Sequence, residues 1–204
     1  MSRIEAAFWD FDGVWSKDRF YNSLAQLHPK AHQFVQTEVF GPNSNGYVDK
    51  WMRAELTMTD INRLISQKTG VDFDLLTKSF IDDVAQMAIE MRHVPIIEKL
   101  KQNGVKVGMI TNNMDVFSTI TAPRLHLLDL FDDRVYNSFT YGVLKADGLY
   151  DIAMRKAGLT DYSTALMIDD SPKARTAFEA KGGLTYAYTN FEEFQDWANK
   201  NLLH

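Results

Sequence analysis

The chain has 204 residues, of which 45% are hydrophobic and 24% charged, and its formal net charge is −5. This is the composition of a globular protein with one ordinary domain and an insertion, or with two small domains. Cysteine is absent, which excludes a disulfide framework, a thiol nucleophile and a cysteine-ligated zinc site.

The same sequence limits the candidate partners. It contains no dense run of Lys or Arg, so we expect no nucleic acid partner. No stretch approaches the roughly 18 apolar residues that span a bilayer, so we expect no membrane partner. The opening residues, MSRIEAAFWD, lack the basic and apolar regions of a signal peptide, which leads us to expect a cytoplasmic protein.

The first predicted element is a buried strand in the apolar run IEAAFWDF, which ends near Gly13. From residue 14 to residue 93 the apolar spacing is helical, with a loop at GPNSNG. The helix within residues 57–70 is expected to begin near Thr59 or Asp60 and to end before Gly70. This segment therefore predicts helices without strands.

Strands and helices alternate in the remainder of the chain. Strands are predicted at residues 105–111, 134–139, 141–144, 164–170 and 184–189. Helices are predicted at residues 96–104, 116–128, 149–158, 172–182 and 191–203. Such alternation favours an α/β fold with a Rossmann-like three-layer core, in which helices cover both faces of a parallel sheet.

Two carboxylates, Asp10 and Asp12, follow the first apolar run, where an unpaired buried charge would be costly. Because they are two residues apart in an extended segment, we expect their side chains on one face, roughly 7 Å apart. A second pair, Asp169 and Asp170, ends a later apolar run. If these strands are neighbours, the four carboxylates meet at one sheet edge and require a divalent cation, for which Mg²⁺ is the usual choice beside a phosphate.

Three further residues are expected at the same edge. Thr111 offers a hydroxyl at the end of a predicted strand, and Asn112 offers an amide before a helix whose free N–H groups suit phosphate oxygens. Lys145 is an isolated cation that can neutralise both a phosphate and a carboxylate. The sequence therefore favours a small-molecule phosphate ester as the partner.

Together these motifs resemble those of the haloacid dehalogenase-like (HAD) superfamily of phosphohydrolases, over essentially the whole chain. DFDGVW resembles the first family motif, Thr111 the second, Lys145 with ADGLYDIA the third, and IDDSP the fourth. The family often has Pro after the lysine of the third motif, where this chain has Ala146. The resemblance implies a helical cap domain at residues 14–93, inserted between motifs one and two of a catalytic core formed by residues 1–13 and 94–204.

The resemblance also implies roles for these residues. Asp10 would be the nucleophile that forms an aspartyl-phosphate, and Asp12 would act as general acid and then general base. Mg²⁺ would be held by the Asp10 carboxylate, the Asp12 backbone carbonyl and Asp170, with support from Asp169. The phosphoryl oxygens would be bound by three residues, Thr111, Asn112 and Lys145.

Asp12 separates the reactions of this superfamily. The haloacid dehalogenases lack this second acid because a halide leaves unprotonated, so Asp12 favours phosphoryl transfer. The predicted function is Mg²⁺-dependent hydrolysis of the phosphate monoester of a small metabolite. A phosphomutase of the β-phosphoglucomutase type and a catalytically silent binding protein on the same fold remain as alternatives. A two-component receiver domain also uses acids and a lysine, but it lacks the helical insertion.

The helical segment is expected to choose the substrate, in a protein that is a monomer or a dimer. Arg53 is a candidate for binding a second anionic group of the substrate. The candidates for lining a substrate pocket are Trp15, Phe20, Tyr21 and Trp51. Most aromatic residues of the segment are nevertheless expected to pack its core, among them Phe34, Phe40 and Trp51.

Overall fold

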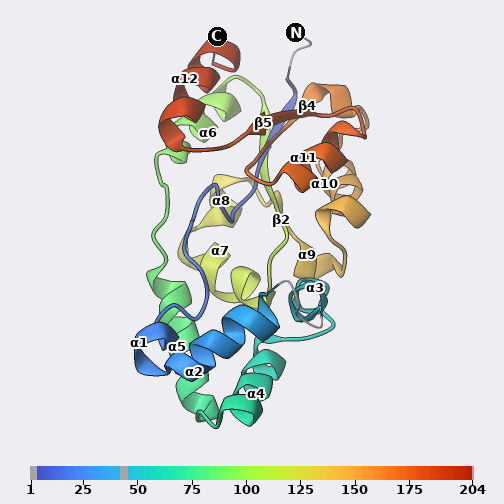
Figure 1. Cartoon of the computed structure of the whole chain (residues 1–204). Coiled ribbons are helices and arrows are strands. Elements are labelled where there is room, and N and C mark those ends of the chain that lie inside the picture. The colour runs from blue at the N-terminus through green and yellow to red at the C-terminus, as the bar shows by residue number, and fades with distance from the viewer. Residues whose placement is uncertain (1–3, 42–45, 204) are drawn as a thin grey trace.

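The computed structural model describes residues 4–41 and 46–203 and contains a five-stranded parallel sheet (Figure 1). The strands are β1 (Ala6–Trp9), β2 (Lys106–Thr111), β3 (Val135–Asn137), β4 (Ala165–Asp169) and β5 (Leu184–Ala187), in the order β3-β2-β1-β4-β5. β1 is central, because Ala6 pairs with Lys106 on one side and with Ala165 on the other. The predicted α/β fold is confirmed.

The residues of β1 point alternately into two separate hydrophobic cores. Ala7 and Trp9 belong to one cluster of buried residues, and Ala6 and Phe8 belong to another. Successive side chains of a strand point to opposite faces, so each cluster covers one face of the sheet. The first cluster packs on α6 (His93–Gln102) and α12 (Phe191–Asn201), and the second on α10 (Leu149–Lys156) and α11 (Pro172–Glu179). Figure 1 shows these two helix pairs on opposite sides of the strands.

The segment between β1 and α6 is helical, and no strand occurs in its described part. Its elements are α1 (Leu24–Leu27), α2 (Pro29–Phe34), the π-helix η1 (Val35–Val39), α3 (Tyr47–Met52), α4 (Met58–Thr69) and α5 (Phe73–Gln86). α4 begins slightly earlier than predicted, because Thr57 is its N-cap and forms a capping box with Asp60. It ends before Gly70 as expected, since Gly70 has a φ of 74°. Residues 42–45, inside the predicted loop, lie outside the described residues.

The helical segment has its own hydrophobic cluster, which contains the fully buried Tyr21 and Trp51. Met114 and Val116, which follow β2, belong to the same cluster. The core of the helical segment is thus shared with a loop at the edge of the sheet. The domain boundaries proposed from the sequence, after residues 13 and 93, remain a prediction.

The connections between β2 and β4 contain the remaining short helices. They are η2 (Phe117–Thr121), α7 (Ala122–Arg124), α8 (Leu127–Leu130), α9 (Ser138–Tyr141), η3 (Lys145–Asp147) and η4 (Tyr162–Thr164). The strand predicted at residues 141–144 was wrong: Asn137 caps α9, and Gly142 ends it with a φ of 69°. No helix in the described ranges is long and apolar enough to cross a membrane.

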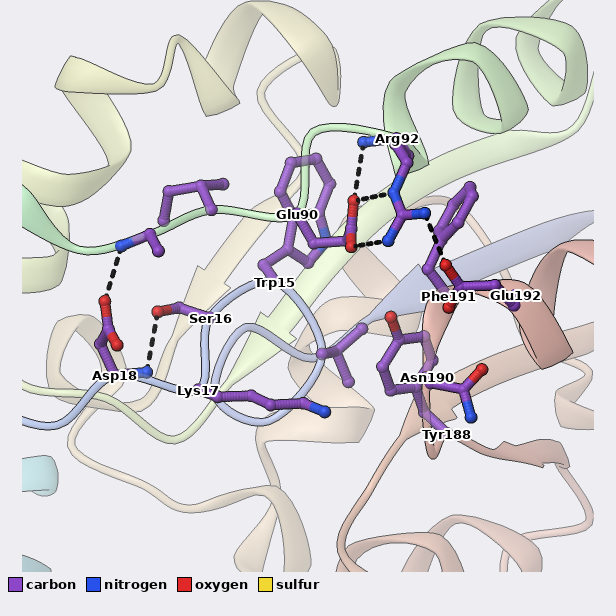
Figure 2. A pocket seen from close by; sticks show the side chains of 13 residues that line it. Trp15, Ser16, Lys17, Asp18, Glu90, Arg92, Tyr188, Asn190, Phe191 and Glu192 are labelled. Atoms are coloured by element: carbon purple, nitrogen blue, oxygen red, sulfur yellow. Dashed lines mark hydrogen bonds and ion pairs between the residues drawn. The ribbon is translucent and has the colours of Figure 1, made fainter.

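Two linkers, the first after β1 and the second before α6, connect the sheet to the helical segment. They are hydrogen-bonded to each other (Figure 2). The backbone N–H of Glu90, in the second linker, donates to the carbonyl of Trp15 in the first at 2.8 Å. Arg92 pairs with Glu90 at 2.6 Å and with Glu192 of α12 at 2.7 Å. These residues line a cavity of about 360 Å³, which we call the hinge cavity. None of the carboxylates predicted to be catalytic lines it.

Candidate active site

The predicted site residues lie at the carboxyl ends of the three central strands. Asp10 directly follows β1, Thr111 ends β2 and Asp169 ends β4. Because β1 lies between β2 and β4 and all three are parallel, these positions share one edge of the sheet. This is the edge at which open α/β sheets bind ligands.

Lys145 lies between two of the carboxylates. Its Nζ is 2.6 Å from Oδ2 of Asp10 and 2.8 Å from Oδ2 of Asp169. The lysine is only 2% exposed, and its backbone N–H donates to Oδ1 of Asn112 at 2.8 Å. The loop of the third motif is thus fixed to the loop after β2, and the ammonium group is placed where a phosphate and the acids can share it.

Burial and charge perturb the pKa of Asp10, Asp12 and Lys145. Burial raises the pKa of Asp10 to about 7, with repulsion from Asp169 and Asp12 adding to it and attraction from Lys145 opposing it. Burial also raises the pKa of Asp12 to about 6. For Lys145 burial disfavours the ammonium, but Asp10 and Asp169 outweigh it and raise the pKa of the lysine. Lys145 alone therefore does not offset the cost of burying Asp10 and Asp12 in their charged forms.

The carboxylates fit a divalent cation. One carboxylate oxygen from each of Asp10, Asp169 and Asp170 can be chosen so that all three lie within 4.8 Å of one another. Asp10 and Asp169 are buried, and burial raises the pKa of Asp10, so a further cation would stabilise its charged form. Hard oxygen donors at this spacing are those that Mg²⁺ binds. The donor set therefore suits Mg²⁺ and offers no nitrogen or sulfur ligand.

Gly13 allows Asp170 to approach the acids of the first motif. Its φ is +81°, and a Cβ built at this position would lie 2.1 Å from Oδ2 of Asp170. Any side chain here would therefore displace Asp170 as well as strain the turn. Arg175 holds the fourth motif from the other side, because its Nη1 donates to the carbonyls of Asp169 at 3.0 Å and Asp170 at 2.8 Å.

Asp12 is oriented by a residue that the sequence did not single out. Nδ2 of Asn113 donates to Oδ2 of Asp12 at 3.0 Å. Asn113 is in turn held by Ser138, whose Oγ accepts from its N–H at 3.0 Å and donates to its carbonyl at 3.1 Å. The side chain of Asp12 therefore takes a defined direction beside Asp10.

A cavity of about 200 Å³, which we call the phosphate cavity, opens onto these groups. Its walls include Asp10, Asp12, Asn112, Lys145 and Asp170. Thr111 lies behind it, fully buried, and its Oγ1 has no hydrogen-bond partner among the described residues. A buried hydroxyl without a partner is costly, so its position at the strand end suits an oxygen of a bound ligand.

Arg53 lies elsewhere. Its guanidinium pairs with Asp147, within the third motif, and it lines neither the phosphate cavity nor the hinge cavity. Asp147 thus occupies the Arg53 guanidinium, and the role of Arg53 toward a second anionic group of a substrate remains a prediction. Its contact instead joins the helical segment to η3.

Arg19 is the cation that sequence reasoning missed. It lines the phosphate cavity, and its charge acts on both Asp12 and Asp170. It is exposed and makes no hydrogen bond or ion pair with any residue in the described ranges. The sequence signal that could have identified Arg19 is its position as a cation in the short linker that follows Asp10 and Asp12. Of the aromatic candidates, Trp15 lines the hinge cavity, whereas Tyr21 and Trp51 are buried in the helical core.

Comparisons with known proteins point to one family. A family model for haloacid dehalogenase-like hydrolases matches residues 4–180. The pyrimidine 5'-nucleotidase YjjG of Escherichia coli (strain K12) is 25% identical over 126 residues, which is 61% of this chain. The match spans only 56% of that relative's length.

Solved structures share the fold at low sequence identity. A predicted HAD-like family hydrolase from Porphyromonas gingivalis has a TM-score of 0.78 at 17% identity, over 100% of both chains. A HAD family enzyme from Bacteroides thetaiotaomicron, solved with magnesium and inorganic phosphate, has a TM-score of 0.68 at 15% identity, over 94% of this chain and 98% of that one. The L-2-haloacid dehalogenase from Xanthobacter autotrophicus, solved with chloropropionic acid covalently bound, has a TM-score of 0.63 at 14% identity, over 98% of this chain and 84% of that one. Because the family model covers most of its length, the chain belongs to the haloacid dehalogenase-like hydrolases.

Proposed function

We propose that the protein is a Mg²⁺-dependent phosphatase that hydrolyses a phosphate monoester through a covalent intermediate on Asp10. One observation carries the proposal. Asp12 lines the phosphate cavity with Asp10 and Lys145, and Asn113 holds its carboxylate in place. A second oriented acid beside the nucleophile serves an alkoxide that needs a proton as it leaves, whereas a halide does not need one.

The proposed reaction has two steps. A carboxylate oxygen of Asp10 attacks phosphorus while the bond to the alcohol oxygen breaks, and Asp12 gives its proton to that oxygen. A water molecule then attacks the phosphorus of the acyl-phosphate, Asp12 takes its proton, and Asp10 is released with inorganic phosphate. The net reaction consumes one water molecule and restores both acids.

The neighbouring residues stabilise the charge that moves during these steps. Lys145 and the Thr111 hydroxyl would bind phosphoryl oxygens, together with Asn112 and Arg19 at the wall of the cavity. Mg²⁺, held by Asp10, Asp170 and the Asp12 carbonyl with Asp169 in support, would supply positive charge against the phosphoryl group. The complex of the Bacteroides enzyme with magnesium and phosphate supports this assignment by analogy.

The direct test is phosphate release by the full-length protein from p-nitrophenyl phosphate and from alkyl phosphates. We expect turnover that requires Mg²⁺, stops with EDTA and is absent in Asp10→Asn. Asp12→Asn should lower the rate by about 10²–10⁴-fold with alkyl phosphates. The loss should be smaller with p-nitrophenyl phosphate, whose leaving group needs less protonation.

Asp129→Asn is the matched control, because this carboxylate is 85% exposed and lies outside the site. Halide release from 2-chloropropionate without phosphate release would assign the chain to the dehalogenases. Formation of an isomerised sugar phosphate would assign it to the mutases. Absence of all three activities would favour a binding protein.

A further inference from the structure

A second cavity, of about 400 Å³, adjoins the phosphate cavity on the side of the helical segment. Asp12, Arg19 and Asn112 line both cavities, so the two spaces meet at these residues. An ester bound with its phosphorus beside Asp10 would direct its alcohol part into the second space. We call this space the alcohol cavity.

Beyond the residues that it shares with the phosphate cavity, five of the seven residues that line the alcohol cavity are apolar: Phe20, Phe40, Val48, Met52 and Met114. The ring of Phe20 packs against Phe40, with ring centroids 6.4 Å apart, and against Phe80 in the core of the helical segment, with centroids 5.3 Å apart. Phe40, which was expected only to pack that core, is therefore also a wall residue. Apolar and aromatic walls of this extent suit a flat ring that can lie against them.

The charges of the cavity disfavour an anionic alcohol. Arg19 is the sole cation among its described lining residues, and it stands at the junction, where its charge acts on Asp12 and Asp170. The carboxylate of Asp18 also lines the cavity and accepts from the N–H of Ala88 at 2.6 Å. A carboxylate or second phosphate on the alcohol would find no cation deeper in the cavity and would face Asp18.

The walls also offer few partners for a hydroxyl-rich alcohol. The side-chain carbonyl of Asn112 already accepts from the N–H of Lys145 at 2.8 Å. The amide of Gln36 makes no hydrogen bond with any residue in the described ranges and remains available at the wall. A sugar would leave most of its hydroxyls without partners against the apolar surface. A ring with one polar edge would satisfy Gln36 and cover the apolar walls.

We infer, on the basis of the proposed phosphatase activity, that the alcohol of the substrate is uncharged and carries a planar ring that binds in the alcohol cavity. Nucleosides and aryl-substituted alcohols share this chemistry. Phosphorylated hydroxy acids, sugar bisphosphates and simple sugar phosphates do not. Phe40 and Gln36 would then determine which leaving group binds.

Matched pairs of substrates test the inference. Uridine 5'-monophosphate and ribose 5-phosphate differ in the planar base, and benzyl phosphate and ethyl phosphate differ in the aryl ring. We expect kcat/KM to be about tenfold or more higher for the ring-bearing member of at least one pair, mainly through a lower KM. 3-Phosphoglycerate and fructose 1,6-bisphosphate should be the poorest substrates.

The outcomes separate this inference from the proposed function. A preference in both pairs supports a nucleoside, and a preference for benzyl phosphate alone supports an aryl alcohol. Phosphate release without preference in either pair would overturn the inference while leaving the phosphatase intact. A preference for the anionic substrates would overturn it as well. Failure to release phosphate from any of the six compounds would reject the proposed function and this inference with it.

Variants of the lining residues test whether the preference for ring-bearing substrates arises in the alcohol cavity. Phe40→Ala should lower the ratio of kcat/KM for benzyl over ethyl phosphate several-fold, whereas Phe34→Ala, from α2 outside the cavity lining, should leave it unchanged. Val48→Ser provides the same readout if circular dichroism shows that Phe40→Ala does not fold. Gln36→Leu, at an exposed position, should lower the ratio for uridine monophosphate over benzyl phosphate if a nucleoside is bound. Unchanged ratios in folded Phe40→Ala and Val48→Ser would contradict the placement of the ring.

Discussion

The Asp10–Lys145–Asp169 cluster and the Glu90–Arg92–Glu192 cluster each place one cation between two carboxylates, but at different depths. In the first, the side chains of the lysine and of its two partners are 3%, 9% and 0% exposed. In the second, which borders the hinge cavity, the arginine is 55% exposed and its partners 25% and 68% (Figure 2). The pairing distances are nearly the same in both clusters, 2.6–2.8 Å and 2.6–2.7 Å.

At Asp10, burial outweighs the effect of pairing with a cation. The hydrogen bonds from Arg92 lower the pKa of Glu90 and of Glu192, as expected for exposed acids beside a cation. Burial raises the pKa of Asp10 to about 7, although Nζ of Lys145 lies only 2.6 Å from Oδ2 of Asp10. The Glu90–Arg92–Glu192 cluster keeps its excess negative charge in contact with solvent, whereas the buried cluster retains a demand for further positive charge. Such a demand is useful where a cation and a phosphate are to be bound.

Replacing Lys145 should produce the largest effect. Lys145→Met would leave Asp10 and Asp169 buried without their cation, and breaking a buried pair in this way costs about 3–5 kcal/mol. We expect a loss of this size in the free energy of unfolding, measured with urea in the presence of EDTA. Phosphate release should also be lost, because the charge beside the phosphoryl group is removed.

Lys181→Met is the control for this experiment. Lys181 pairs with Asp151 at 2.8 Å, as close as Lys145 to Asp169, but the two side chains are 30% and 53% exposed. If both lysine variants lost the same stability, depth would not explain the difference between the clusters.

His93 is a buried base that packs against residues lining the hinge cavity. Its ring is fully buried, 3.4 Å from the carbonyl of Val14, and is surrounded by aromatic rings. The rings are those of Trp15, Tyr188, Phe191 and Phe194. Burial lowers the pKa of His93 from 6.5 to about 4, with Val14 and Glu90 opposing the shift and Arg92 adding to it. Desolvation thus moves this base and Asp10 in opposite directions, each towards its neutral form.

The pH dependence of stability follows from that shift. Between pH 6.5 and about 4 the unfolded chain binds a proton at His93 and the folded chain does not. The contribution is therefore complete above the unfolded pKa and is lost as the pH falls towards the folded pKa. His93→Gln should remove it, so the stability difference between wild type and variant should shrink by on the order of 3 kcal/mol between about pH 7 and about pH 4. Urea unfolding across this range measures the difference; parallel curves for wild type and variant would contradict the prediction.

The positions of the acids could be predicted because strand ends have a strong sequence signal. Apolar runs that stop at Asp10, Thr111 and Asp169 identify β1, β2 and β4, and parallel strands bring their carboxyl ends to one edge. Lys145 could be predicted as the isolated cation in a chain that must bind an anion. For these residues the local pattern and the topology suffice.

The residues that were missed or misplaced depend on contacts between distant segments. Asn113 reaches Asp12 across 101 residues, and its support from Ser138 spans another 25, so no short motif contains the network. Arg53 pairs with Asp147, 94 residues away, and this packing of the helical segment on η3 is invisible in the sequence. To predict Arg19 as a site residue, one would need to know which side of the linker after β1 faces Asp10 and Asp12. Side-chain partners across the interface between helices and sheet therefore needed the structure.

Arg92→Ala should have the smallest effect, and its salt dependence sharpens the comparison of the two clusters. Water can replace most of its exposed contacts, although its guanidinium also lies 4.5 Å from the ring centre of Phe191. We expect a small loss in the midpoint of thermal unfolding at low ionic strength, which disappears towards 1 M NaCl, where the Debye length is about 3 Å. The loss of stability in Lys145→Met should persist at both ionic strengths, because ions do not screen a pair that is buried from solvent. If the midpoint of thermal unfolding of Arg92→Ala fell equally at low and high salt, the guanidinium would stabilise the protein by packing on Phe191 rather than by its charge.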